Sequence, residues 1–446
     1  MMPKNKGGKL YLGLMRNFYF LLTVATGFLA TQSIAQGKTD AALLSLLGSN
    51  NHPAMKQIVQ DPLKYRCQII YTRINRNEKQ EPSFQHYYFN YDPKLYFNPA
   101  SVVKMPLAFL SLEKLNTLKI PGVNKYTSLL IDSSYPGQVI AYRDSTSANG
   151  LPGIAHYIKR ALLISENDPY NRMYQFLGQE DINRSLHKKG YPDAIISRQF
   201  MGYSEEQNRH TNPFRFINGK GQVIYQQPAA YNRDSLPFSQ VIKIGKAYMN
   251  RNDSIIPEPF DFTRHNNISL GDFQRQLQSV LFPESVPAQQ RFNLTADDRN
   301  FLLKYLSQYP SETDYPKYND SVFYDSYVKF FFRDSTRQMP AHVRVFNKVG
   351  WAYGFLTDIS YVVDTRNNIE YMLAATVYVN SDEVVNDGKY DYETTGWPFL
   401  HELGQTIYRH ELTRKREYRP KLNGFGIRYD QRNKKDVRPV ITTVDN

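Results

Sequence analysis

The sequence predicts an α/β protein of the α+β type, in which both ends of the chain form one antiparallel β-sheet and the region between them forms a mostly helical lobe. Two segments near the N-terminus, 66–74 and 83–90, are rich in β-branched and aromatic residues, as strands are. Three more such segments follow one another near the C-terminus, at 342–348, 358–364 and 369–379. Because these strands enclose a long helical region, we expect the two ends to share a sheet with flanking helices.

The N-terminus has the features of a secretory signal peptide. Four basic residues precede an apolar run at 18–30, and small residues stand at positions 33 and 35. This run is shorter than the ~20 residues that span a bilayer. We therefore predict a cleaved signal peptide over 1–35 and a periplasmic mature protein, with an uncleaved N-terminal anchor as the alternative.

Charge and cysteine content limit the classes of partner. Cys67 is the only cysteine, so the mature protein folds without an intramolecular disulfide. The net charge is +13, and the last part of the chain, from 409 onward, holds eleven Lys or Arg against five Asp or Glu. We expect 413–446 to be a solvated basic tail, able to make weak contact with an anionic envelope surface. We expect no nucleic-acid partner, no metal or other cofactor, and a monomer.

The helical region begins at a clear start signal and contains an irregular middle. Asn98 and Pro99 form an N-cap followed by a proline, and helical spacing continues over 102–118, where Pro106 is expected to interrupt the helix. Within a catalytic domain over 36–412, we interpret about 205–265 as an insertion. It holds a hairpin signal, Asn-Gly-Lys-Gly, inside 214–227. Further helices are expected at 151–189, 269–283, 295–308 and 395–414.

Ser101 and Lys104 form an S-x-x-K pattern at the start of this helix. Residues three apart share a helix face, so the lysine amine can reach the serine hydroxyl and, with a lowered pKa, take its proton. The pattern alone is weak evidence. It recurs at Ser111/Lys114, Ser185/Lys188 and Ser326/Lys329.

Two further triplets accompany the first pattern, and the set resembles a known family. Ser165-Glu166-Asn167 follows an apolar helical run, and Lys348-Val349-Gly350 ends a predicted strand. Together they resemble the S-x-x-K, S-D-N and K-T-G motifs of class A β-lactamases and penicillin-binding proteins. The resemblance implies a β-lactamase/transpeptidase-like fold and an exported serine hydrolase.

The resemblance also implies roles for individual residues. Ser101 would form the acyl-enzyme, Lys104 would help to deprotonate it, and Ser165 would relay a proton to the leaving nitrogen. Asn167 would bind the amide side chain of the substrate, and Lys348 would attract the substrate carboxylate.

The third motif also implies an oxyanion hole next to the substrate. The backbone N–H groups of Ser101 and Trp351 would form it, with Gly350 beside them in the substrate-binding strand.

The sequence departs from the family pattern in three places. Glu166 replaces an aspartate, and Val349 replaces a threonine or serine whose hydroxyl would bind the substrate carboxylate. The family's Glu-x-x-x-Asn segment, which activates the hydrolytic water, is reduced to Glu205 and Glu206 just before Asn208. Either glutamate could be the hydrolytic base on a shifted loop, or both could be solvated loop carboxylates.

Three functions remain open at this point. The leading hypothesis is a hydrolase that acylates Ser101 with a β-lactam or a related amide and then hydrolyses the product. The second is a D,D-peptidase, or penicillin-binding protein, that acts on cell-wall stem peptides. The third is a catalytically weakened protein that binds wall peptide or a partner protein.

Overall fold

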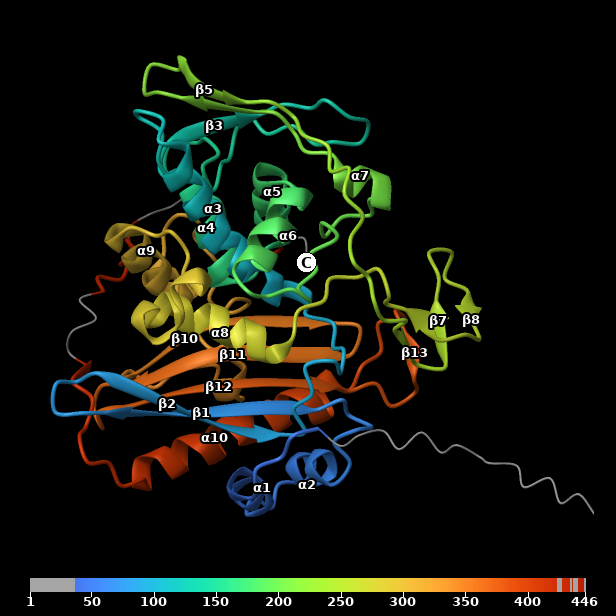
Figure 1. Cartoon of the computed structure of the whole chain (residues 1–446), viewed down its shortest axis with the longest axis vertical. Coiled ribbons are helices and arrows are strands. Elements are labelled where there is room, and N and C mark those ends of the chain that lie inside the picture. The colour runs from blue at the N-terminus through green and yellow to red at the C-terminus, as the bar shows by residue number, and fades with distance from the viewer. Residues whose placement is uncertain (1–36, 423–426, 434, 436–439, 445–446) are drawn as a thin grey trace, which may run out of the picture. The chain divides into compact units, whose positions relative to one another are not determined.

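The structure is a computed structural model that describes residues 37–422, 427–433, 435 and 440–444, and its centre is a five-stranded antiparallel sheet (Figure 1). The strands lie in the order β10-β11-β12-β1-β2. Their bounds are β1 Gln68–Arg76, β2 Pro82–Phe89, β10 Val343–Ala352, β11 Phe355–Asp364 and β12 Ile369–Tyr378. Because β1 pairs with β12, both ends of the mature chain share one sheet, and the predicted fold class is confirmed. The predicted signal peptide lies outside the described residues.

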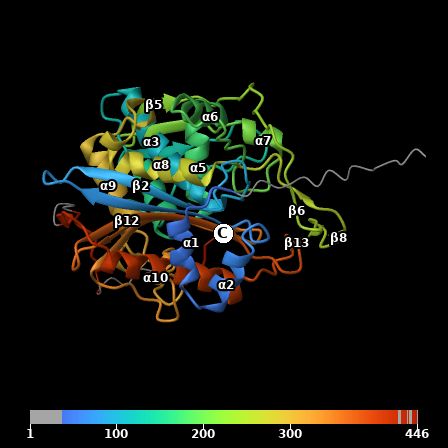
Figure 2. The same ribbon diagram turned by 60° about the horizontal axis from the view of Figure 1, so that its bottom comes forward.

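Helices cover both faces of this sheet, so β11 and β12 are buried along their whole length. One face packs against α1 Ala41–Gly48, α2 Pro53–Gln60 and α10 Trp397–Thr413. The other face packs against α8 Leu270–Leu281 and the helical lobe (Figure 2). The lobe consists of α3 Lys104–Leu118, α4 Ile154–Leu163, α5 Asn167–Leu177, α6 Gln179–Lys188 and α9 Ala296–Ser307. Two apolar cores result, one on each side of the sheet.

The first helix of the lobe begins as a 3₁₀ turn, Ala100–Val103, and becomes α3 at Lys104. The Asn98 side chain accepts a hydrogen bond from the Ala100 N–H at 2.8 Å, as an N-cap does. Pro106 thus falls in the first turn of α3, where the backbone N–H groups have no α-helical partner. The expected interruption at Pro106 is therefore wrong, because the 3₁₀ turn moves the start of the α-helix.

The irregular middle of the chain is built from short elements. It contains α7 Glu205–Arg209, β4 Phe214–Ile217, β5 Val223–Gln227, β6 Lys243–Ile244, β7 Ala247–Met249, β8 Ile255–Ile256 and β9 Phe260–Asp261. β4 and β5 pair antiparallel, as the hairpin signal predicts, and β3 Ser128–Ile131 extends them to three strands. The sequence did not predict β13 Val384–Val385, which pairs with β7 and joins the C-terminal third to this region (Figure 1).

The described part of the basic tail packs on the helical lobe. The Asp430 carboxylate pairs with Lys159 and Lys304, and Ile441 forms a parallel bridge with Tyr318. Asp430 and Ile441 therefore contact the rest of the protein, contrary to the expectation of a solvated tail, although both residues are only half-buried. In the described part of the chain, no helix combines the length and apolar character needed to cross a membrane.

Candidate active site

Ser101 lies on the 3₁₀ turn that precedes α3, and Lys104 is the first residue of α3. A 3₁₀ helix has three residues per turn, so side chains three apart lie directly above one another. The Lys104 Nζ is 2.7 Å from the Ser101 Oγ, and the lysine side chain is fully buried. This spacing lets the amine exchange a proton directly with the hydroxyl.

The second motif lies on the turn between α4 and α5 and surrounds the same amine. Lys104 Nζ donates to the Asn167 Oδ1 at 2.7 Å and to the Ser165 backbone carbonyl. Ser165 has a φ of +73°, a left-handed conformation that is strained for a serine. This conformation directs both its carbonyl and its hydroxyl toward the lysines of the site.

Lys348 reaches the site from the sheet. Its Nζ donates to the Ser165 Oγ at 2.7 Å and to the Val349 carbonyl at 2.8 Å. The Ser165 Oγ is also 3.4 Å from the Lys104 Nζ, so one hydroxyl bridges two buried amines. The structure thus brings Ser101, Lys104, Ser165, Asn167 and Lys348 together where the sheet meets the helical lobe.

Burial keeps the pKa of Lys104 well below its usual value, and the nearby charge of Lys348 lowers this pKa further, against an opposing effect of Glu166. Burial also lowers the pKa of Lys348 strongly. A neutral amine has two N–H donors and one lone pair. In that form, two N–H donors for Ser165 and Asn167 would leave the lone pair of Lys104 for the Ser101 hydroxyl, 2.7 Å away, as a general base requires.

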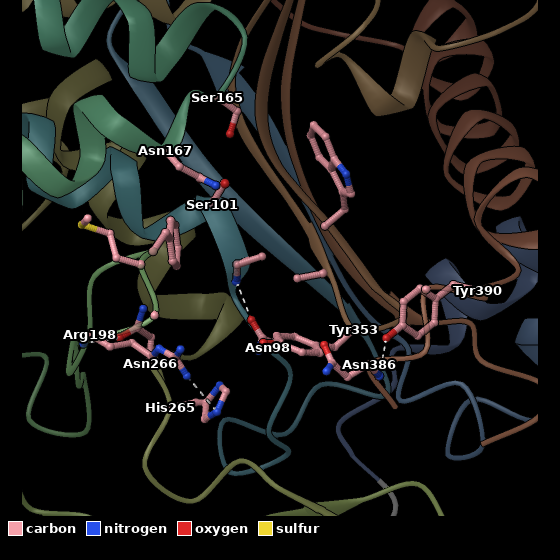
Figure 3. A pocket seen from close by; sticks show the side chains of 17 residues that line it. Asn98, Ser101, Ser165, Asn167, Arg198, His265, Asn266, Tyr353, Asn386 and Tyr390 are labelled. Carbon is pink, nitrogen blue, oxygen red and sulfur yellow. Dashed lines mark hydrogen bonds between the residues drawn. The ribbon is translucent and has the colours of Figure 1, made fainter. Parts of the chain in front are cut away.

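These residues open onto a cavity of about 670 Å³ (Figure 3). Ser101, Ser165, Asn167 and Trp351 line it. Four lining residues other than glycine have a positive φ, namely Ser165, Ala100 at +43°, Tyr353 at +53° and Asn386 at +68°. Such strain is costly and collects at functional sites.

Gly350 allows β10 to pass close to the turn that holds Ser101. A Cβ at this position would lie 2.4 Å from the Pro99 carbonyl oxygen and 3.0 Å from the Ser101 nitrogen. Gly350 does not itself line the cavity. Its structural contribution is therefore to let Trp351 and Ser101, the two predicted oxyanion donors, approach each other.

The two substituted motif positions point away from the cavity. Glu166 is buried, pairs with Arg160 and accepts a hydrogen bond from the Tyr318 hydroxyl at 2.6 Å. Val349 is 1% exposed and packs in the core on the far side of the sheet from the helical lobe. A hydroxyl at Val349 would therefore enter that core, and the expected substrate contact at this position is not supported.

Glu205 is not brought to the site. Its side chain is 63% exposed, pairs with Arg264 and does not line the cavity. The Glu206 carboxylate lies 3.2 Å from the Nε2 of His210, the residue that follows this short helix. The prediction of a hydrolytic base at Glu205 therefore has no support in the geometry. Among the described residues, no aspartate or glutamate lines the cavity.

The other S-x-x-K patterns lie elsewhere. Ser111 is fully buried in α3, and Lys114 donates to the Phe176 carbonyl at 2.6 Å. Ser185 and Lys188 lie on α6, and the patterns at 111, 185 and 326 contribute nothing to the cavity lining. Only the pattern at Ser101 has the second and third motifs beside it.

Sequence reasoning missed one wall of the cavity. It is formed by Arg198, Phe200, His265, Asn266, Asn386 and Tyr390. These residues come from irregular segments with no periodicity. The pairing of β13 with β7, together with a hydrogen bond from Asn386 to the Met249 carbonyl, brings the 386–390 segment near the insertion. The richness of 190–265 in aromatic, asparagine and proline residues was the available signal.

The sheet shared by both chain ends, with a helical lobe and a serine–lysine pair at their junction, is the architecture that the resemblance to class A β-lactamases implies. Residues 64–224 match the model of the Beta-lactamase enzyme family, and this range contains the first two of the three motifs on which the resemblance rests.

Comparison with solved structures gave low-identity matches. A β-lactamase from Desulfarculus baarsii is 13% identical with a TM-score of 0.44, over 83% of this chain and 99% of that one. The chromosome-encoded β-lactamase of Vibrio parahaemolyticus is 13% identical with a TM-score of 0.43, over 80% and 97%. A β-lactamase from Sphaerobacter thermophilus is 12% identical with a TM-score of 0.43, over 82% and 97%. The comparison with curated proteins gave no match.

Proposed function

We propose that this chain is an exported serine enzyme in which Ser101 attacks the carbonyl carbon of a β-lactam or a related amide and forms an acyl-enzyme. The observation that carries the proposal is the contact of the Ser101 hydroxyl with the buried Lys104 amine at 2.7 Å. Lys104 takes the Ser101 proton as the new C–O bond forms. The backbone N–H groups of Ser101 and Trp351 stabilise the oxyanion.

Breaking the amide bond requires a proton on the leaving nitrogen. Ser165 gives its hydroxyl proton to that nitrogen and receives the proton held by Lys104, whose Nζ is 3.4 Å away. Lys348 holds the Ser165 oxygen in place at 2.7 Å and offers positive charge to a substrate carboxylate. Protons therefore balance over the acylation step.

The environment of the acyl group supports slow hydrolysis. No carboxylate among the described residues lines the cavity, and the Phe200 ring covers Lys104. A site of this kind is acylated by β-lactams but lacks a side chain to activate water. This favours, as a second candidate, a D,D-peptidase acting on cell-wall stem peptides, for which a β-lactam is a slowly released inhibitor.

A fluorescent penicillin tests the proposal. We expect covalent labelling of the wild type, complete loss in Ser101→Ala, and retention in Ser111→Ala. Ser111 is the matched control, because it belongs to an S-x-x-K on the same helix and its buried hydroxyl has no hydrogen-bond partner among the described residues. Wild-type protein that folds but takes no label would overturn the proposal. Rapid loss of the label from the wild type would favour a β-lactamase over a D,D-peptidase.

A further inference from the structure

Arg198 is the charged side chain that the missed wall contributes to the cavity. It is partly buried and forms no ion pair with a carboxylate among the described residues. The cavity lining there contains no acidic residue either. A guanidinium has five N–H donors and matches a carboxylate with two parallel hydrogen bonds. An uncompensated guanidinium at a cavity wall is therefore suited to an anionic ligand.

Neighbouring groups hold Arg198 in place without neutralising it. Its Nη1 donates to the His265 Nε2 at 3.1 Å, and its backbone N–H donates to the Asn266 Oδ1 at 3.2 Å. Burial, with a smaller effect of Arg198, lowers the pKa of His265 to about 3, so the imidazole stays neutral and accepts this bond. Arg198 and His265 both line the cavity.

The position of Arg198 identifies the part of the substrate that it meets. Figure 3 shows Ser165 at one end of the cavity and Arg198, His265 and Asn266 at the other, with Ser101 between them. Ser165 serves the leaving nitrogen in the proposed mechanism. The opposite end therefore receives the side chain of the acyl group.

We infer that Arg198 binds a carboxylate on the acyl side chain, so that the preferred substrates are acyl donors with an anionic side chain. This inference rests on the proposed function and specifies its substrate class. It assigns Arg198 to specificity and not to proton transfer.

Two penicillins that differ by one carboxylate test the inference. Benzylpenicillin and α-carboxybenzylpenicillin share the same ring system, and the second carries the extra carboxylate on its acyl side chain. We expect the ratio of second-order acylation rates, carboxylated over neutral, to fall about tenfold in Arg198→Ala. Arg264→Ala is the control, because it removes an exposed arginine that pairs with Glu205 outside the cavity. Its ratio should match the wild type.

Each outcome decides one of the two proposals. An equal ratio in wild type and Arg198→Ala, with Ser101 still labelled, overturns the inference and leaves the proposed function intact. If neither penicillin labels the wild type, the proposed function fails, and equilibrium binding of both compounds to Ser101→Ala then tests the inference. Tighter binding of the carboxylated compound, lost on adding Arg198→Ala, supports it, and equal binding overturns it.

Discussion

The aromatic ring of Phe200 lies over the amine of Lys104, with the Nζ 5.2 Å from the ring centroid. An apolar ring therefore covers one side of the proposed general base. The ring contributes to the burial that lowers the lysine pKa. Its position also leads us to expect that the acyl-enzyme forms much faster than it is hydrolysed.

The first prediction concerns hydrolysis of the acyl-enzyme. Glu205→Gln should leave the hydrolysis rate within about twofold of wild type, because the Glu205 carboxylate pairs with Arg264 and lies outside the cavity. Loss of the acyl group is followed by intact-protein mass spectrometry after free penicillin is removed. A slowing of about tenfold or more would identify Glu205 as the base after all.

The second prediction concerns pH. Lys104 acts as base when neutral, so the acylation rate should rise with pH through the Lys104 pKa and level off above it. Because Lys348 lowers this pKa, Lys348→Met should raise it and move the midpoint of the pH profile to higher pH. The maximal rate also falls, but the midpoint is the informative quantity. A midpoint that stays in place or moves down would contradict the assignment of Lys104 as base.

The third prediction concerns Gly350. In Gly350→Ala the new methyl group meets the Pro99 and Ser101 backbone, which cannot move without displacing the nucleophile. We expect a loss of about 1–3 kcal/mol in the free energy of unfolding and at least a tenfold, order-of-magnitude loss of acylation rate. Urea denaturation and labelling kinetics measure the two effects.

Gly48→Ala is the control for this substitution, because a Cβ there meets nothing within 4 Å and lies in α1. It should not destabilise the protein. Equal behaviour of the two variants would mean that the close approach at Gly350 has no consequence.

The fourth prediction concerns Lys329, a buried lysine whose hydrogen bonds connect β10 with α9. Lys329 donates to the Leu306 and Val345 carbonyls, both at 2.9 Å, and to the Asn347 Oδ1 at 2.6 Å. Lys329→Met leaves these acceptors and the nearby Asp358 carboxylate without their cation. We expect a loss of about 3 kcal/mol in the free energy of unfolding, measured by urea denaturation.

Lys246→Met is the matched control, because Lys246 pairs with Glu383 at the surface and its side chain is 78% exposed. It should change the free energy of unfolding by less than about 0.5 kcal/mol. If Lys329→Met changes the free energy of unfolding as little as Lys246→Met does, the buried lysine does not stabilise β10.

Local patterns explain what could be predicted from the sequence. The strand alternation and the three motifs each lie within a few consecutive residues, so fold class and the residues around Ser101 follow from them. The alternation of side chains along a strand also places Lys348 and Val349 on opposite faces of the sheet, and this signal is present in the sequence. The placement of Arg198 depends instead on long-range packing of irregular segments, and Asn386 is positioned by the pairing of β13 with β7. No local pattern encodes such contacts.

The most direct test of the central claim is to locate the acyl group. Full-length mature protein is incubated with benzylpenicillin, digested, and analysed by peptide mass spectrometry. The account predicts one penicilloyl group, on the hydroxyl of Ser101, and none on Ser111 or Ser165. An adduct on a different residue, or an unmodified Ser101 in folded protein at saturating penicillin, would contradict it.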